Sequence, residues 1–375
     1  MGFFERIEAG GHEEVVLVAD AAVGLRAIIA IHSTALGPSL GGVRFWHYPT
    51  EDDALADVLA LSEAMTLKAA AAGLDQGGGK AVVMWDDPHA PRPEPFLRSL
   101  GRAIHQLGGR YLAAEDVGAT QADMDGLALE TPWVTGVDPA SGGSGDPSPV
   151  TALGVLHGMH AACAEAFGDR TLAGRRVVVQ GAGHVGEHLV NLLTGAGASV
   201  AVADIDGEKA ARLGATHAVD VVEPAAVLEE PCDVLSPCAL GGTLTPDRVD
   251  RLRCSVVCGA ANNQLAVPEV DDALAARGIV YAPDFVVNAG GIINIAEEFT
   301  GYSPERAGAR AAAIEATTAG IFDRARAWHL APGRAAARVA RERIAREGAG
   351  RRWMPGDPAA WTEGAPLTRL RPGRS

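Results

Sequence analysis

Apolar residues follow two different periods along the first 145 residues, and these periods predict alternating strands and helices. Short apolar runs are typical of strands, whereas apolar positions that recur every three or four residues indicate an amphipathic helix. The longest helical stretch begins after Thr50, which forms a capping-box pattern with Asp53. We therefore expect strands over 15–18, 27–31, 80–85 and 110–114, and helices over 51–72 and 95–107.

From residue 150 the alternation becomes more regular. A helical segment over 150–166 is followed by short apolar runs, most of which are separated by helical segments. Repeated strand–helix–strand units imply a parallel, doubly wound sheet. The first expected strand of this part begins at 176 and turns into a helix at the glycines of 181–186. Further strands are expected over 198–203, 233–235, 255–258 and 279–281.

A Gly-, Ser- and Pro-rich segment over 141–149 marks the expected boundary between two domains, which suits a chain of 375 residues. The first α/β domain is expected to cover 1–145 and the second, a Rossmann dinucleotide-binding domain, 146–329. Ala-, Arg- and Glu-rich helices follow, and those of 330–347 are expected to pack back on the first domain. Residues 348–375 are expected to form a mobile tail.

The composition is that of an ordinary globular protein, with 47% hydrophobic and 21% charged residues. A net charge of −15 without a basic stripe argues against a nucleic-acid partner. No apolar run reaches membrane-spanning length, and the first residues lack the organisation of a signal peptide. Five scattered cysteines without a C-x-x-C pair are typical of reduced thiols, so we expect a cytoplasmic protein.

Lysine is rare in this chain, and its placement points to chemistry. Only three lysines occur among 32 basic residues, and Lys68 and Lys80 lie twelve residues apart around a run of glycines. Arginine keeps its proton in a protein, whereas a lysine amine can lose it when it is desolvated or lies beside another cation. We therefore expect that Lys68 and Lys80 are needed as amines. Two surface lysines left by chance are the simpler alternative.

A dinucleotide-binding pattern begins at Gly181. The sequence G-x-G-x-x-G follows an expected strand, opens a helix, and has Asp204 at the end of the next strand, 23 residues later. Gly181 permits a tight turn, Gly183 a close approach to a pyrophosphate, and Gly186 close packing of helix on sheet. Asp204 would accept hydrogen bonds from the adenosine ribose and repel a 2′-phosphate, which favours NAD over NADP. A Rossmann-like domain without a nucleotide is the alternative. The expected cofactor contacts here are Gly181, Ala182, Gly183, His184, Val185, Gly186, Asp204 and Ile205.

Motifs outside this turn resemble those of the Glu/Leu/Phe/Val dehydrogenase family, and in particular its leucine and valine dehydrogenase branch. They extend from Gly11 to about Arg346 and are together far more specific than the glycine turn alone. The resemblance implies an N-terminal α/β domain for substrate binding and oligomerisation, a Rossmann domain, C-terminal helices and a homo-oligomer. The matching segments are 36–44, 65–68, 77–80, 114–118, 146–151, 237–241, 259–264 and 281–291.

This resemblance implies roles for individual residues. Lys80 is the catalytic base, and Asp116 assists proton transfer at the amine carbon. Lys68 binds the substrate carboxylate, with help from Gly41 and Gly42. Oxidative deamination needs a fixed carboxylate and an activated water, and a lysine can activate that water if its pKa is lowered. The resemblance further assigns Thr151, Cys238, Ala239, Asn262 and Asn288 to the cofactor, with Asn262 also contacting the substrate.

The positions that match the family's side-chain pocket are all apolar: Leu40, Ala114, Ile292 and Ile295. A glutamate-specific pocket would need a cation there. The two isoleucines are bulkier than the valines expected in a leucine dehydrogenase, so the pocket should favour short branched side chains. The expected reaction is the NAD-dependent, reversible oxidative deamination of valine, leucine or isoleucine to the 2-oxo acid and ammonia.

Two other functions stay open. One is a phenylalanine dehydrogenase of the same family, and the other is a non-catalytic NAD-binding regulator on the same fold. The pairs His184/His188 and His157/His160 have spacings that could bind a metal, but His184 lies inside the glycine turn and no carboxylate accompanies either pair at a suitable spacing. We expect no metal site.

Overall fold

The structure is a computed structural model that describes residues 2–87, 90–350 and 352–353. The chain forms two compact units. Unit 1 contains residues 2–146, 294–304 and the described residues from 340 onward, and unit 2 contains Pro147–Ile293 and Glu305–Val339. Most of the expected mobile tail lies outside the described residues. Within its described part, Trp353 is buried and its backbone N–H donates to Thr34 Oγ1 at 3.1 Å.

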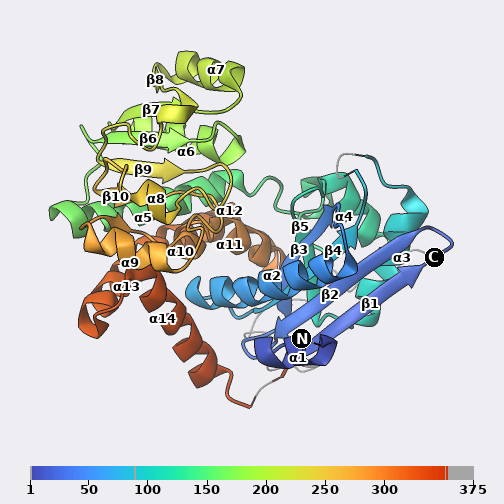
Figure 1. Ribbon diagram of the computed structural model, residues 1–375. Coiled ribbons are helices and arrows are strands. Elements are labelled where there is room, and N and C mark those ends of the chain that lie inside the picture. The colour runs from blue at the N-terminus through green and yellow to red at the C-terminus, as the bar shows by residue number, and fades with distance from the viewer. Residues whose placement is uncertain (1, 88–89, 351, 354–375) are drawn as a thin grey trace. The chain divides into compact units, whose positions relative to one another are not determined.

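Unit 1 is built on a five-stranded mixed sheet (Figure 1). Strand β2 pairs antiparallel with β1 and β4, whereas β3 runs parallel to β4 and β5. The strands expected in this part are confirmed, but β3 was not expected, because two glycines and an arginine interrupt its apolar residues. In the order across the sheet, the strands are β1 (Glu14–Asp20), β2 (Leu25–Ser33), β4 (Gly77–Met84), β3 (Ser39–Trp46) and β5 (Tyr111–Glu115).

Helices cover both faces of this sheet. Successive side chains of a strand point to opposite faces, and on β2 both sets are buried. Ile29 and Ile31 of β2 join a core with α3, whereas Ile28 and Ala30 join a core with α2. The expected capping box of α2 is present: Thr50 Oγ1 accepts from the Asp53 N–H at 3.1 Å, and Asp53 Oδ2 accepts from the Thr50 N–H at 3.1 Å. The helices of unit 1 before residue 147 are α1 (Phe3–Gly10), α2 (Glu51–Ala71), α3 (Glu94–Gln106) and α4 (Gln121–Ala128), with a 3₁₀ turn η1 (Pro139–Ser141).

The glycine run before Lys80 belongs to strand β4, which corrects the expected strand start at residue 80. The three glycines are buried and none of them has a positive φ, so space and not backbone freedom explains them. A Cβ on Gly78 would lie 2.1 Å from the backbone nitrogen of Thr66 in α2, and one on Gly77 would lie 1.8 Å from the carbonyl oxygen of Ser33. The glycines therefore let α2 and the neighbouring chain pack directly on the β4 backbone.

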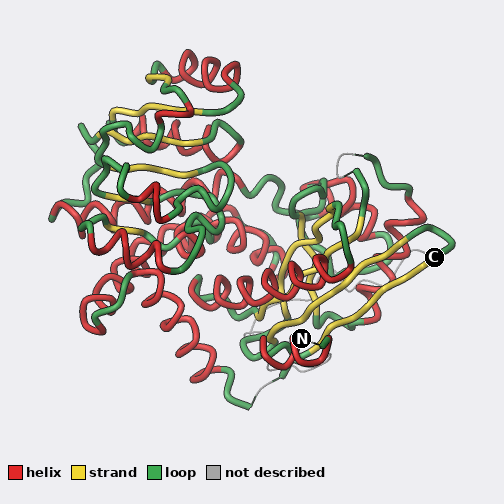
Figure 2. The backbone as a smooth tube through the Cα atoms, viewed as in Figure 1, coloured by secondary structure: helices red, strands yellow, loops and turns green. Residues whose placement is uncertain are grey.

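Unit 2 contains a six-stranded sheet in which every pairing is parallel, in the order β11-β10-β9-β6-β7-β8. Figure 2 shows these strands alternating with helices along the chain. The doubly wound Rossmann fold is confirmed, although the short edge strand β8 was not expected. The strands are β6 (Arg176–Gln180), β7 (Ser199–Ala203), β8 (Asp220–Val221), β9 (Val234–Pro237), β10 (Val256–Val257) and β11 (Val280–Tyr281).

Glycines also allow the long helix α5 to pack on the segment that follows β11. A Cβ on Gly158 would lie 2.4 Å from Val287 Cγ1, and one on Gly290 would lie 2.1 Å from the carbonyl oxygen of Val150. The helices from here to residue 328 are α5 (Ser148–Phe167), α6 (His184–Gly195), α7 (Gly207–His217), α8 (Pro246–Val249), α9 (Glu269–Ala276), α10 (Asp284–Val287), α11 (Gly290–Ala296), α12 (Pro304–Ala312) and α13 (Ile314–Trp328), with 3₁₀ turns η2 (Pro224–Ala226) and η3 (Glu297–Thr300).

The last helix, α14 (Pro332–Glu347), belongs to unit 2 up to Val339 and to unit 1 from Ala340. In its second part, Arg343 donates to the Ala70 and Leu74 carbonyl oxygens at 3.2 and 2.7 Å. These carbonyls lie at and just beyond the C-terminal end of α2, where helix carbonyls lack intrahelical partners. No helix among the described residues is both long enough and apolar enough to cross a membrane.

The close packing at β4 predicts that Gly78→Ala destabilises the protein. The added Cβ would overlap the Thr66 backbone, and overpacking of this kind costs about 1–3 kcal/mol. Gly195→Ala is the matched control, because a Cβ at the end of α6 meets nothing within 4 Å. Urea unfolding measures both variants. Equal midpoints for Gly78→Ala and the wild type would contradict the packing argument.

Candidate active site

Lys80 is buried in the middle of unit 1. It lies in β4, the central strand of the sheet, and the alternation along the strand places it with Val82 on the face that α2 covers. Only 4% of the residue is exposed. Its Nζ lies 3.0 Å from Oδ2 of Asp116, which directly follows the C-terminal end of β5. The two residues predicted to act together are therefore in contact.

Gly42 gives Asp116 the room to reach Lys80. Strand β3 lies between β4 and β5, Gly42 pairs with Ala114, and the register with β4 places Gly42 beside Lys80. A Cβ on Gly42 would lie 2.5 Å from the Cβ of Asp116. The Asp116 carboxylate can thus cross over β3 only because this position has no side chain.

Burial and charge act on the two groups in different directions. Burial lowers the pKa of the Lys80 amine below its ordinary value, the nearby Arg44 lowers it too, and the Asp116 carboxylate opposes the shift. Burial would raise the pKa of Asp116, but the charges of Lys80 and Arg44 outweigh it, so this pKa lies below its ordinary value. The result is an ionised carboxylate beside an amine that gives up its proton more readily than a solvated lysine.

Gly41 and Gly42 present their backbone in a fixed orientation. The hydroxyl of Tyr111, buried in the sheet's core, donates to the Gly41 carbonyl at 2.8 Å and to the Gly42 carbonyl at 3.2 Å. A Cβ on Gly41 would lie 1.7 Å from the Gly79 carbonyl oxygen. Lys68 lies near the C-terminal end of α2, two residues after Thr66, where this helix contacts β4, and its side chain is partly buried.

Three further residues of the site were not predicted from the sequence: Arg44, Asp57 and Tyr48. Arg44 Nε donates to Asp116 Oδ2 at 2.8 Å, and its NH1 donates to Asp57 Oδ2 at 3.1 Å. The Tyr48 hydroxyl donates to the same Asp57 oxygen at 2.6 Å. Arg44 ends one of the segments that resemble the family, 36–44, but one arginine among 29 carries no signal by itself. Its contact with Asp116 depends on strand pairing, which the sequence does not reveal.

In unit 2 the glycine turn has the geometry that its spacing predicted. Gly181 has a φ of +115°, and a Cβ there would lie 2.9 Å from the Ala239 nitrogen and the Cys238 carbonyl carbon. A Cβ on Gly186 would lie 2.0 Å from the Gly181 carbonyl oxygen, which explains the close packing of α6 on the turn. Gly183 is surrounded by open space, since a Cβ there meets nothing within 4 Å.

Asp204 is held against this turn. Its Oδ2 accepts from the Ala182 N–H at 2.7 Å, and its Oδ1 accepts from the Asp206 N–H at 2.8 Å. Asp204 is partly buried, whereas Ile205 beside it is 92% exposed. The first residues of α6, including His184 and Val185, follow the turn. An anchored carboxylate beside an exposed apolar side chain is a suitable surface for an adenosine.

Asn288 joins the residues at the carboxyl edge of this sheet. Its Nδ2 donates to the Asn262 Oδ1 at 2.8 Å and to the Ala260 carbonyl at 3.0 Å. Its Oδ1 is buried without a hydrogen-bond partner among the described residues. Thr151 lies close by, with its Oγ1 3.0 Å from where a Cβ on Gly291 would be. A buried acceptor without a partner fits the carboxamide N–H of a nicotinamide.

Two protein-family models match most of the chain. Residues 12–132 match the Glu/Leu/Phe/Val dehydrogenase dimerisation domain. Residues 142–214 and 208–309 match the glutamate/leucine/phenylalanine/valine dehydrogenase model.

The chain belongs to the Glu/Leu/Phe/Val dehydrogenase family.

Similar proteins support this family membership over almost the whole chain. A valine dehydrogenase of Streptomyces virginiae is 50% identical, over 90% of this chain and 95% of that one. A leucine dehydrogenase of Thermoactinomyces intermedius is 47% identical, over 92% and 94%. The crystal structure of the L-tryptophan dehydrogenase from Nostoc punctiforme superposes with a TM-score of 0.82 at 37% identity, covering 92% of this chain and 99% of that one. The protein is thus an amino-acid dehydrogenase of a family that uses a nicotinamide cofactor.

The four positions expected to line the pocket for the substrate side chain of this dehydrogenase lie on strands β3 and β5 and on helix α11. The alternation along β3 and β5 places Leu40 and Ala114 on the sheet face of Lys80, and both are buried. Ile292 and Ile295 lie on α11, where Ile292 is buried and Ile295 is partly exposed. Their joint role in a pocket stays a prediction.

One of the two histidine pairs of this dehydrogenase, His157 and His160, contacts other groups. His157 Nδ1 lies 3.1 Å from Glu315 Oε2, and His160 Nδ1 lies 2.8 Å from the Arg170 carbonyl oxygen. Among the residues that the structure describes, no group of three or more His, Cys, Asp or Glu side chains is arranged to hold a metal ion.

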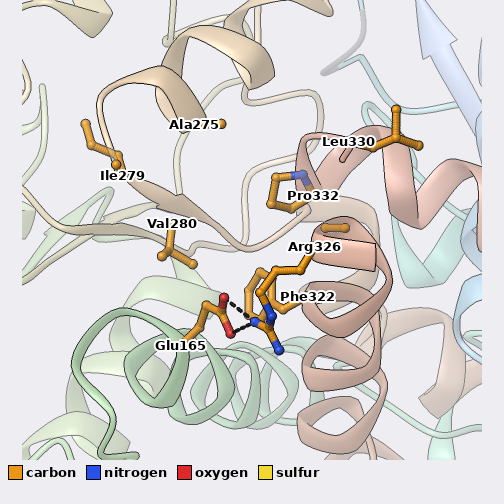
Figure 3. A pocket seen from close by; sticks show the side chains of 10 residues that line it. Glu165, Ala275, Ile279, Val280, Phe322, Arg326, Leu330 and Pro332 are labelled. Carbon is orange, nitrogen blue, oxygen red and sulfur yellow. Dashed lines mark hydrogen bonds and ion pairs between the residues drawn. The ribbon is translucent and has the colours of Figure 1, made fainter. Parts of the chain in front are cut away.

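Unit 2 contains a cavity of about 310 Å³, and Figure 3 shows the side chains that line it. It is lined by Ile279 and Val280 at the start of β11, by Phe322, and by the ion pair of Glu165 with Arg326. The glycine turn lies at the C-terminal end of β6, and the strands are parallel, so the cavity lies at the opposite edge of the sheet.

Proposed function

We propose that the protein catalyses the reversible, NAD-dependent oxidative deamination of a branched-chain L-amino acid to the 2-oxo acid and ammonia. The observation that carries the proposal is the buried Lys80–Asp116 contact in a chain about half identical to valine and leucine dehydrogenases. A regulator that only binds NAD has no need of a buried amine with a lowered pKa.

The residues of unit 2 fit a nicotinamide dinucleotide. The glycine turn leaves open space at Gly183 for a pyrophosphate, and the first N–H groups of α6 favour its negative charge. Asp204 and Ile205 would hold the adenosine, with Cys238 and Ala239 beside the turn. Thr151, Asn262 and Asn288 would hold the nicotinamide end. When bound, NAD supplies the acceptor for the hydride that leaves Cα.

The residues of unit 1 perform the proton chemistry. Lys68 holds the substrate carboxylate as a cation, together with the backbone of Gly41 and Gly42. Lys80, in its neutral form, takes a proton from the water that attacks the imine carbon. Asp116 takes or returns a proton at the nitrogen that leaves as ammonia. The lowered pKa of Lys80 increases the share of neutral amine that can act as a base.

The wall around the substrate side chain would be formed by four apolar residues: Leu40, Ala114, Ile292 and Ile295. Each isoleucine carries one methylene more than valine, and a buried methylene is worth about 0.8 kcal/mol. Two extra methylenes narrow the pocket and should shift selectivity toward short branched side chains, relative to larger ones, by roughly tenfold. Valine and its short branched relatives therefore fit better than phenylalanine, and glutamate lacks a cation to pair with.

In a homo-oligomer, we expect unit 1 to supply the subunit contacts. Residues 12–132 of this unit match the model that is described as a dimerisation domain.

The first prediction of this proposal is the substrate and cofactor profile. Absorbance of the reduced nicotinamide, measured with a panel of amino acids and with NAD or NADP, should show efficient turnover of valine, leucine and isoleucine with NAD. Phenylalanine should react poorly and glutamate negligibly. Preference for phenylalanine would support the aromatic alternative and refute the size argument. Binding of NAD without turnover of any amino acid would support a regulator.

The second prediction is that Lys80→Arg loses turnover by several orders of magnitude while NAD binding stays near the wild-type value. Arginine keeps the positive charge but cannot give up its proton. Lys209→Arg is the matched control, because Lys209 is half-exposed and pairs with Asp206 at 3.4 Å. Steady-state kinetics and NAD titration measure both variants. An arginine variant within about tenfold of wild type would contradict the general-base role.

The third prediction concerns Asp204. Asp204→Asn keeps an oxygen that can accept from Ala182 but removes the negative charge, whereas Asp204→Ala removes both. We expect the asparagine variant to reduce the difference in affinity between NAD and NADP. The alanine variant should reduce this difference and also bind NAD more weakly. Dissociation constants for both cofactors check this. If the wild type uses NADP as well as NAD, the charge argument for Asp204 fails.

A further inference from the structure

Oδ2 of Asp116 has two cations as neighbours, not one. Lys80 Nζ lies 3.0 Å from it and Arg44 Nε lies 2.8 Å from it. Arg44 lies on β3, two residues after Gly42, on the strand between those of Lys80 and Asp116. The three side chains come from three neighbouring strand segments, so their meeting point is set by the sheet.

Arg44 is itself held in place. Its NH1 donates to both carboxylate oxygens of Asp57 in α2, to Oδ2 at 3.1 Å and to Oδ1 at 3.4 Å. Tyr48 donates its hydroxyl to Asp57 Oδ2 at 2.6 Å. The exposed fractions of the Arg44, Asp57 and Asp116 side chains are 22%, 29% and 21%, so water screens these contacts only in part. A guanidinium that contacts two carboxylates through different nitrogens has a defined orientation.

We propose that Arg44 is a positioning residue for the reaction: it holds the Asp116 carboxylate against Lys80 and keeps it ionised when Lys80 is neutral. This role rests on the proposed function of Lys80 as the base. Arg44 acts through Asp116, and the proposal needs no contact between Arg44 and the substrate or cofactor.

The physical reason is the charge balance of a buried pair. If Lys80 were the sole cationic neighbour of Asp116, deprotonation of Lys80 would leave the Asp116 carboxylate buried without a counter-charge. Because an unpaired buried charge is costly, Lys80 would then keep its proton. Arg44 stays charged at any working pH, so it balances Asp116 in both states of Lys80. The directions of the shifts agree with this, since Arg44 lowers the pKa of Lys80 and contributes to the lowered pKa of Asp116.

The other ionisable groups around Lys80 leave this balance in place. Burial raises the pKa of Tyr48 and that of Tyr111 above the ordinary value of a tyrosine, so both stay neutral. Asp57 of α2 is paired with Arg44, and its charge raises the pKa of Lys80. Lys68 lies on the same helix as Asp57 and is proposed to bind the substrate carboxylate.

The test measures the ionisation of Lys80 directly. The chain contains only three lysines, so protein labelled with ¹³C at the lysine ε-carbon gives three signals by NMR, and Lys80→Arg assigns the one of interest. We expect Arg44→Gln to move the Lys80 titration to higher pH. Arg98→Gln is the matched control, because Arg98 of α3 pairs with Glu94 and Glu130. It should leave the titration in place.

Kinetics provide the second readout. In Arg44→Gln, kcat/KM at pH 7 should fall by roughly tenfold or more and recover as the pH is raised, because more Lys80 becomes neutral. NAD binding should not change. A loss that is equal at every pH, or a Lys80 titration identical to wild type, would overturn the proposal.

A conservative variant covers the case in which Arg44→Gln does not fold. The Arg44→Lys variant keeps a cation at this position, but its single amine cannot contact Asp116 and Asp57 through separate, fixed nitrogens. We expect a smaller shift of the Lys80 titration in the same direction and a reduced kcat. An unchanged titration together with unchanged turnover would refute the positioning role. If the wild type turns over no amino acid, the proposed function fails, while the titration still decides whether Arg44 governs Lys80.

Discussion

A lysine amine buried in the central strand of a sheet is the constraint on which the rest of unit 1 depends. Burial makes the charged form of Lys80 costly, and a chain can tolerate such a group only when a partner lies within contact distance. Asp116 supplies that partner at 3.0 Å, and Arg44 supplies a second cation at 2.8 Å from the same carboxylate oxygen. The site is therefore a three-charge arrangement whose net charge changes when Lys80 loses its proton. That property suits a base and has no evident use in a purely structural pair.

This arrangement exists only because glycines allow backbones to approach. Asp116 crosses strand β3 at Gly42, and α2 rests on β4 at Gly78, where any side chain would overlap its neighbour. The same device recurs in unit 2, where Gly186 lets helix α6 contact the glycine turn and Gly290 lets α5 contact the segment after Asn288. In each case the glycine is needed for space, and at Gly181 a positive φ is needed as well. The glycines at these four contacts are thus explained by close packing around the two sites.

The two units divide the chemistry. Unit 2 offers features suited to a dinucleotide: an open turn at a helix N-terminus, an anchored Asp204, and the Oδ1 of Asn288, which has no partner within the described part of the chain. Unit 1 offers features suited to proton transfer. Family membership makes the protein an amino-acid dehydrogenase, and the charges in unit 1 explain how a lysine could act as the base in such an enzyme.

Local structure and family membership could be predicted from the amino-acid sequence alone. Apolar periods predicted most of the strands and the longer helices, because amphipathic patterns are local, but not the short helices α1 and α4. The capping box at Thr50 and the turn at Gly181 depend only on nearby residues. The motifs around Lys80 and Asn288 identified the family. The tertiary structure decided what depends on strand pairing: that Gly77–Gly79 form a strand, that β3 exists and lies between β4 and β5, and that Arg44 meets Asp116. Residues 44 and 116 are far apart along the chain, and only the order β4-β3-β5 brings their side chains together, so no period or spacing in the sequence could have revealed that contact.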